Sequence, residues 1–214
     1  MNYKKLIVDS GVKMISGGYT LETWGNISCR DTETGLVYIT PSGMDYSTLT
    51  EEDVVVLTPD GNVAEGFRKP SIEAGLHLAV YRARADVNAI IHTHAPYSIV
   101  FSCTGEDIPM IIDEAAQVLG DTCRTAKYAL PGSTELAEEC VKALGDKAAS
   151  CLLKSHGAVC TGATMDAAFK VVKVLETTAH IYQMILAAGR KPDPISDENI
   201  AAMQYFVKNV YGQR

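Results

Sequence analysis

Hydrophobic positions along this chain follow two patterns, one typical of helices and the other of strands. Apolar side chains at a period of about 3.6 residues predict helices over residues 4–16, 73–84, 136–144, 166–189 and 197–209. Short apolar runs bounded by turn residues predict strands over residues 36–40, 53–58 and 87–93. Residues 149–160 are expected to form a strand, a turn at His156-Gly157 and a second strand.

The order of these elements indicates the fold class. The sequence Pro59-Asp60-Gly61-Asn62 follows the second strand and predicts a hairpin, so neighbouring strands should be largely antiparallel. Helices alternate with the strands and would cover the faces of the sheet. We therefore expect a single α/β domain over residues 1–214, with three layers in the order helices, central mainly antiparallel sheet, helices.

Composition and charge narrow the class of protein. Hydrophobic residues make up 47% of the chain and charged residues 21%, as in an ordinary globular protein. The net charge of −7 and the scattered Lys and Arg residues argue against a nucleic-acid-binding surface. No apolar run approaches the roughly 18 residues of a membrane span. The polar N-terminus and the irregularly spaced cysteines favour a cytoplasmic protein with reduced thiols.

Three histidines form a candidate metal site. His92 and His94 end the expected strand 87–93, and side chains at i and i+2 of a strand point to the same face. His156 would supply a third ligand, and three protein ligands with an open fourth position are typical of catalytic zinc. The competing interpretation is that these are ordinary polar residues after a strand. His77 is a weaker candidate for the third ligand than His156.

Several short segments carry groups that suit a phosphate or a proton transfer. In Lys69-Pro70-Ser71-Ile72-Glu73, Ser71 can cap the following helix, whose N-terminus attracts anions, and Glu73 lies at the same turn. The segments Gly25–Ser28 and Thr40–Gly43 offer backbone amides and small donors. Taken alone, each segment could equally be a capped helix or a plain turn.

Taken together and in this order, the segments resemble the zinc-dependent class II aldolase/adducin-head family, and within it the fuculose-phosphate aldolases. The resemblance covers nearly the whole chain. The matching motifs are Gly25-Asn26-Ile27-Ser28, Thr40-Pro41-Ser42-Gly43, Lys69-Pro70-Ser71-Ile72-Glu73, His92-Thr93-His94 and Ser155-His156-Gly157, followed by Phe206 and Tyr211-Gly212.

The resemblance implies a role for each group of residues. It implies that His92, His94 and His156 bind Zn²⁺, that Glu73 is the acid/base, and that the substrate phosphate is held by Asn26, Ser42, Gly43 and Ser71. It also implies a homotetramer with active sites between subunits, in which Tyr211 reaches into a neighbour's site. The partner would be a phosphorylated sugar, and no nucleic acid or membrane is expected.

The expected reaction is the cleavage of a ketose 1-phosphate, such as L-fuculose 1-phosphate, to dihydroxyacetone phosphate and an aldehyde. A zinc ion suits the enediolate that this cleavage leaves, because it can act as a Lewis acid on two neighbouring oxygens. Glu73 would move a proton to and from the reacting carbon.

The sequence also departs from the pattern of the family. Ile72 replaces a second serine, and Asp113 stands where the fuculose-phosphate aldolases have a tyrosine. Glu114 aligns with the catalytic glutamate of the methylthioribulose-1-phosphate dehydratases. An alternative is therefore a sugar-phosphate dehydratase or a sugar-acid-phosphate decarboxylase that uses Glu114. A third is a non-catalytic module like the adducin head, which the intact histidines and Glu73 disfavour.

Overall fold

The computed structural model of the chain describes residues 1–212, so residues 213 and 214 of the expected domain lie outside the described part. Its core is an eight-stranded sheet in the order β4-β3-β2-β1-β5-β8-β7-β6. Every neighbouring pair is antiparallel except β6 and β7, which are parallel. The strands are β1 (Asn26–Arg30), β2 (Val37–Ile39), β3 (Val55–Leu57), β4 (Val63–Glu65), β5 (Ala89–Thr93), β6 (Arg124–Ala126), β7 (Ser150–Leu153) and β8 (Gly157–Gly162).

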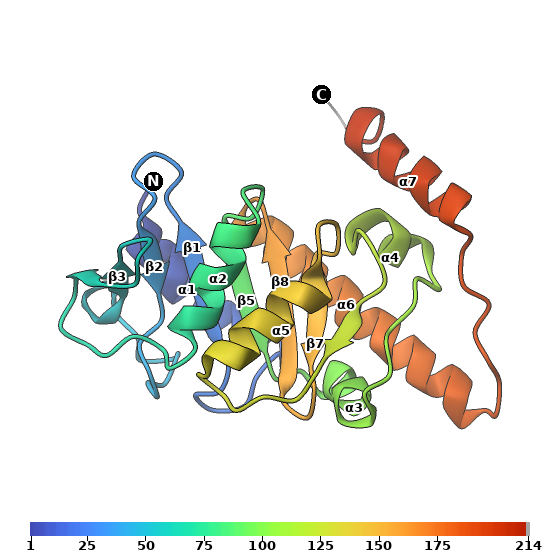
Figure 1. The fold of residues 1–214 in the computed structure, drawn as a ribbon, viewed down its shortest axis with the longest axis horizontal. Helices are drawn as coiled ribbons and strands as arrows, with labels where there is room; N and C mark the ends of the chain where they lie inside the picture. The colour runs from blue at the N-terminus through green and yellow to red at the C-terminus, as the bar shows by residue number, and fades with distance from the viewer. Residues whose placement is uncertain (213–214) are drawn as a thin grey trace.

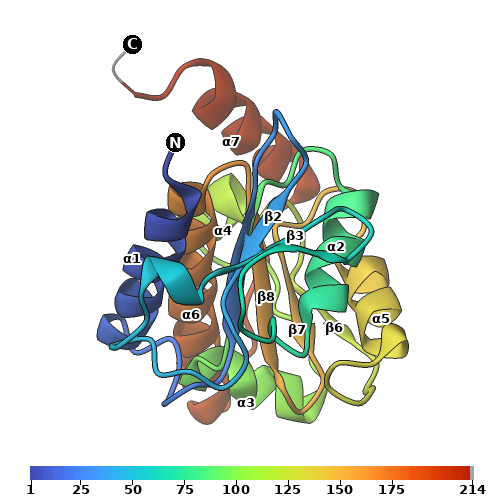
Figure 2. The same cartoon turned by 90° about the vertical axis from the view of Figure 1, so that its left-hand side faces the viewer.

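Helices cover both faces of this sheet, which confirms the expected three layers (Figures 1 and 2). One face packs against α2 and α5, and the other packs against α1, α3, α4 and α6. A short 3-10 helix, η1, spans Glu51–Asp53. The α-helices are α1 (Tyr3–Ser16), α2 (Ala74–Ala83), α3 (Pro96–Thr104), α4 (Asp113–Val118), α5 (Thr134–Leu144), α6 (Met165–Ala187) and α7 (Asp197–Asn209).

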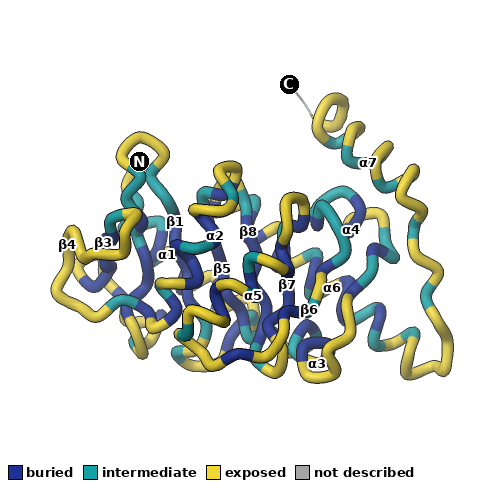
Figure 3. The backbone as a smooth tube through the Cα atoms, in the orientation of Figure 1, coloured by how far each residue is buried: buried dark blue, intermediate teal, exposed yellow. Residues whose placement is uncertain are grey.

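The alternation of side chains along the central strands decides what each face contains. In β5, Ala89 and Ile91 belong to the core under α6, while Ile90 belongs to the core under α2. In β1, Ile27 and Cys29 also lie under the α1 and α6 layer. The even-numbered residues of both strands, including Asn26 and His92, therefore point toward α2. Figure 3 shows that the middle strands are buried along most of their length.

The expected helices and hairpin are present with small shifts at their ends, and β3 and β4 pair antiparallel as predicted. One expectation was wrong: the segment Gly25–Ser28 was interpreted as a turn, but Asn26 begins the central strand β1. The helices α3 and α4 and the strand β6 were not predicted. Among the described residues, no helix is long and apolar enough to cross a bilayer.

The last helix, α7, stands apart from the two cores. None of its residues is buried, and Figures 1 and 3 show it extending from the rest of the molecule. Gln204 donates hydrogen bonds to the carbonyl oxygens of Ala116 and Gly120 beside α4. Phe206 lies within α7, as the expected helix over residues 197–209 implies, and Tyr211 and Gly212 follow the helix. The end of the segment, residues 213 and 214, is outside the described residues.

Candidate metal centre and active site

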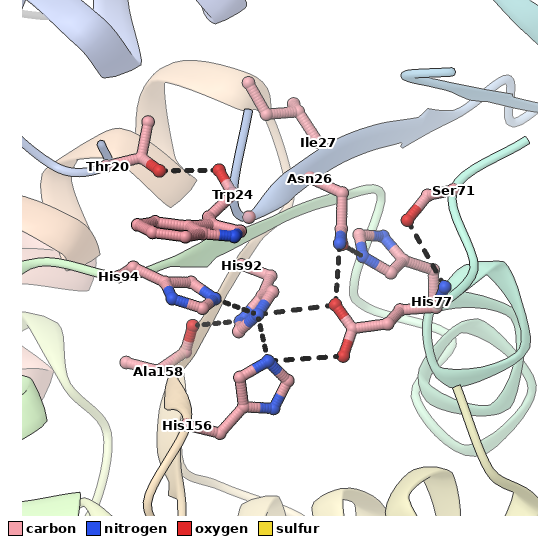
Figure 4. Close-up of polar contacts among 12 residues, drawn as sticks. Thr20, Trp24, Asn26, Ile27, Ser71, His77, His92, His94, His156 and Ala158 are labelled. Carbon is pink, nitrogen blue, oxygen red and sulfur yellow. Dashed lines mark hydrogen bonds and ion pairs between the residues drawn. The ribbon is translucent and has the colours of Figure 1, made fainter. Parts of the chain in front are cut away.

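The three predicted metal ligands meet at one end of the sheet. His92 is on β5 and His94 follows it, both on the side covered by α2. His156 lies in the turn between β7 and β8, and β8 pairs with β5, which brings the imidazoles together. His94 Nε2 is 3.1 Å from His92 Nε2, and His92 Nε2 is 3.3 Å from His156 Nε2. Figure 4 shows the three rings converging on one point.

This spacing fits a tetrahedral metal ion. Bonds of about 2.0–2.1 Å from zinc to nitrogen place neighbouring ligand atoms roughly 3.3–3.4 Å apart in a tetrahedron. His92 Nδ1 lies 3.0 Å from the carbonyl oxygen of Ala158. Because a carbonyl only accepts, Nδ1 carries the hydrogen and Nε2 is left with its lone pair toward the cluster. The residues present therefore fit a divalent cation such as zinc.

The protonation of the other two histidines also favours metal binding. Burial lowers the pKa of His94 to about 3, with the neighbouring His92 and His156 acting in the same direction. Burial and His92 lower the pKa of His156 to about 4, although Glu73 opposes them. Both rings are consequently neutral near pH 7, which is the form that binds a metal.

Glu73 lies beside the cluster, immediately before α2. Its Oε2 is 3.4 Å from His92 Nε2, and its Oε1 is 3.6 Å from His156 Nε2. Burial raises the pKa of Glu73, but His92, His156 and a hydrogen bond from Asn26 outweigh burial, so the pKa lies below its ordinary value. Oε1 is buried and has no hydrogen-bond partner among the described residues. A carboxylate oxygen in that position is ready to accept a proton or a cation.

A cavity of about 430 Å³ opens in front of Glu73. The residues expected to hold a phosphate all line it, namely Asn26, Ser42, Gly43 and Ser71. Two backbone hydrogen bonds fix the loops that form this wall: Ser42 N donates to Lys69 O (3.0 Å), and Ser71 N donates to Thr40 O (3.1 Å). Ser71 Oγ accepts from Glu73 N (3.2 Å), but the N-cap of α2 is Glu73 and carries no side-chain cap, so Ser71 orders the turn before the helix and the predicted helix cap was wrong.

Sequence reasoning missed the apolar side chains of the same cavity. Trp24 stacks over His94 with ring centroids 6.2 Å apart, and Trp24 and Ile72 remain largely exposed at the rim. Pro131 contributes from the loop before α5. The only sign of Trp24 in the sequence was its position directly before the Gly25-Asn26 motif.

Glu114 and Tyr211 are not brought to this cavity within the described part of one chain. Glu114 is exposed in the first turn of α4, and Tyr211 is exposed after α7. Figure 1 shows α4 and α7 at the upper right, whereas α3, which follows the histidine pair, lies at the lower side. The roles predicted for these two residues therefore depend on a second copy of the chain and stay predictions.

Comparison with known proteins identifies the family of this chain. The sequence profile described as "Class II Aldolase and Adducin N-terminal domain" matches residues 5–183. A 5-deoxy-D-ribulose 1-phosphate aldolase of Bacillus thuringiensis serovar kurstaki is 41% identical over 183 residues, covering 86% of this chain and 85% of that protein. An L-fuculose phosphate aldolase of Escherichia coli K12 is 34% identical over 208 residues, covering 97% of this chain and 94% of that protein.

A solved structure described as L-fuculose 1-phosphate aldolase superposes with a TM-score of 0.92 at 36% identity, covering 96% of each chain. The matches run across the metal-ligand candidates, Glu73 and the loops of the cavity wall. Several proteins similar to this chain are sugar-phosphate aldolases, and the chain belongs to the class II aldolase and adducin N-terminal domain family.

Proposed function

We propose that this protein is a metal-dependent aldolase that cleaves a ketose 1-phosphate to dihydroxyacetone phosphate and an aldehyde. The observation that carries the proposal is the convergence of three imidazole Nε2 atoms and a buried, ionised Glu73 on one cavity. A binding module like the adducin head has no need of this arrangement. His92, His94 and His156 would hold the metal, and zinc suits three imidazoles with an open position.

The chemistry divides between the metal and the side chains. When bound, the metal supplies a Lewis acid that polarises substrate oxygens. Cleavage breaks the C3–C4 bond and leaves its electron pair on C3, while the C4 hydroxyl gives its proton to the ionised Glu73 and becomes the aldehyde oxygen. Glu73 then delivers that proton to C3 and returns to its ionised form, and in the direction of synthesis it takes the proton from C3. Asn26, Ser42, Gly43 and Ser71 would hold the phosphate and keep C3 in register.

We further propose that the active form is a homotetramer in which a neighbouring chain completes the site. Support comes from the exposed aromatic side chains at the end of the described chain, where Phe206 and Tyr211 lie with ring centroids 6.0 Å apart. Tyr211 of a neighbour would hydrogen bond the oxygen that becomes the aldehyde. Glu114 is exposed on the same side of the molecule, so it is a second candidate for that position.

Two candidate substrates follow from the relatives, which include a 5-deoxy-D-ribulose 1-phosphate aldolase and an L-fuculose phosphate aldolase. 5-Deoxyribulose 1-phosphate would leave acetaldehyde, and L-fuculose 1-phosphate would leave the larger lactaldehyde. The exposed Trp24 and Ile72 give the cavity rim an apolar character, which favours an aldehyde half with few hydroxyls. We therefore expect the deoxy substrate to be cleaved with the higher kcat/KM.

The test is a panel of ketose 1-phosphates incubated with the zinc-loaded protein, with dihydroxyacetone phosphate detected by enzymatic reduction. Glu73→Gln should retain zinc and lose roughly 10²–10⁴-fold in turnover, because an amide keeps the shape but cannot exchange the proton. Release of carbon dioxide or a dehydrated product without dihydroxyacetone phosphate would transfer the assignment to the lyase reactions that use Glu114. Normal cleavage by Glu73→Gln would remove Glu73 from the proposed role.

A further inference from the structure

A continuous row of buried polar side chains runs from Glu73 away from the metal centre into the space between α2 and β1. Asn26 Nδ2 lies 2.7 Å from Glu73 Oε2, and Asn26 Oδ1 lies 2.5 Å from His77 Nε2. His77 Nδ1 lies 2.6 Å from Ser28 Oγ, and Ser28 Oγ lies 2.7 Å from the hydroxyl of Tyr81. Figure 4 shows two members of this row, Asn26 and His77, next to each other.

The chemistry of the groups determines which atom donates at each step. Asn26 directs its NH₂ group toward Glu73, because Nδ2 is the atom that faces Oε2 and the carboxylate oxygen accepts from it. The amide oxygen of Asn26 then faces His77 Nε2, which must carry a hydrogen. Burial lowers the pKa of His77 to about 3, so the ring is neutral and its Nδ1 has a free lone pair. Ser28 therefore donates to Nδ1 and accepts from Tyr81.

All the hydrogens of the row consequently point in one direction, toward Glu73. His77 and Ser28 are completely buried, and Asn26 and Tyr81 nearly so, and the groups of the row are one another's hydrogen-bond partners. Reversing any one member would bring two acceptors or two donors together in a site of low polarity, which is costly. The row thus permits a single orientation of the Asn26 amide.

We propose that His77, oriented by Ser28, is a positioning residue that holds the Asn26 amide against Glu73 Oε2. One carboxylate oxygen is thereby fixed, and the other, Oε1, is left unpaired beside His156 as the oxygen that exchanges the proton with substrate. This inference rests on the proposed role of Glu73 in proton transfer. It also gives Asn26 a task besides phosphate binding, and an amide nitrogen with two hydrogens can serve both.

The orientation of the row can be tested without turnover. The chain has only five histidines, so ¹⁵N-histidine labelling of the zinc-loaded protein gives a short set of ring signals, and His77→Gln identifies those of His77. We expect a neutral His77 with its hydrogen on Nε2 and none on Nδ1. Ser28→Ala removes the donor to Nδ1 and should shift the Nδ1 signal, while the hydrogen stays on Nε2 opposite the Asn26 oxygen. A hydrogen on Nδ1 of the unmodified protein, or on both nitrogens, would overturn the proposal.

The functional part can be tested by exchange of the C3 hydrogen of dihydroxyacetone phosphate with deuterium from the solvent, which needs no aldehyde. Glutamine and methionine have similar length, but only glutamine can donate from the position of His77 Nε2. His77→Met should lower the kcat of exchange about 10–100-fold, the range typical of residues that orient a site. KM for dihydroxyacetone phosphate should stay within about twofold, and His77→Gln should recover most of the loss.

A matched control separates positioning from general loss of stability. Thr178→Val removes a buried hydrogen bond of 2.7 Å within α6, away from the row, and should lower the melting temperature without changing exchange. A folded, zinc-loaded His77→Met with normal exchange, or a His77→Gln no better than His77→Met, would overturn the positioning role. Absence of exchange in the unmodified protein, or normal exchange in Glu73→Gln, would instead overturn the proposed function.

Discussion

Replacing Gly157 by alanine tests whether the close approach of β8 to β5 sets the spacing of the histidines. A Cβ on Gly157 would lie 2.3 Å from the carbonyl oxygen of Thr93 and 3.1 Å from Cε1 of His92. Carbon–oxygen contacts are ordinarily about 3.3–3.6 Å, so the two strands must separate by roughly 1 Å to admit the methyl group. His92 and His156 lie on opposite sides of this contact, so the separation changes the distance between their rings.

The expected effect has two measurable parts. Overpacking of this kind costs about 1–3 kcal/mol in the free energy of unfolding. In a chain of this size each kcal/mol corresponds to roughly 2–4 °C in melting temperature. Displacing a ring that binds metal typically weakens metal affinity by about 10–100-fold. We therefore expect Gly157→Ala to melt earlier and to lose zinc to a chelator at lower chelator concentration.

Gly75→Ala is the matched control, because a Cβ on Gly75 in the first turn of α2 would meet no atom within 4 Å. Alanine is favoured over glycine in a helix by about 0.5–1 kcal/mol, so this variant should be slightly more stable and bind zinc normally. Thermal unfolding and zinc competition with a chromogenic chelator measure both parts. A Gly157→Ala protein with the unmodified melting temperature and zinc affinity would refute the argument that this contact sets the site.

Three further predictions follow from other parts of the structure. His92→Ala should lose most bound zinc by elemental analysis, because His92 Nε2 lies within 3.3 Å of Nε2 of both other ligands, and full retention of zinc would contradict the assignment. The Asp53 carboxylate accepts hydrogen bonds from Thr50 and Arg68, and these contacts hold its pKa below the ordinary value. The ionised carboxylate therefore stabilises the folded protein above the unfolded-state pKa of about 3.9. This stabilisation is lost as the pH falls through the folded-state pKa. Asp53→Asn should therefore lower stability at pH 7 by about 1 kcal/mol and reduce its fall on acidification, as urea denaturation at several pH values would show. Deletion after Asn209 should leave the melting temperature and zinc content nearly unchanged, since Val210 and Tyr211 are exposed, but should depress turnover; an equally active truncated protein would remove Tyr211 from the site.

The pairing of His92 with His94 could be predicted from the sequence because it depends on a local rule. The pleat of a strand places His92 and His94 on one face whatever the rest of the fold does. The third ligand also needed β8 to pair with β5, and the expected strand–turn–strand at residues 149–160 did not predict that pairing. A glutamate in the first turn of a helix is common, so Lys69–Glu73 alone does not predict a catalytic role. The role of Glu73 could be predicted only from the order of several motifs along the chain.

Elements whose stability comes from distant residues were the ones missed. The helix α3 begins at Pro96, and its first free N–H groups, at Tyr97 and Ser98, donate to the carboxylate of Glu176 on α6. Nothing near residue 96 in the sequence announces that partner. β6 has three residues and pairs in parallel with β7, so its existence depends on a contact far along the chain.

β1 and the row behind Glu73 were missed for a related physical reason. The segment Asn26–Arg30 alternates polar and apolar residues, as a strand should, but polar positions suggest solvent, whereas Ser28 is completely buried. His77 and Tyr81 are four residues apart, on the face of α2 that also carries buried aliphatic side chains. Polar groups on a buried helix face need hydrogen-bond partners. His77 and Tyr81 on α2 find theirs in Ser28 on β1. Hydrogen bonds through His77 and Asn26 therefore connect Ser28 on β1 to the carboxylate beside the histidine cluster.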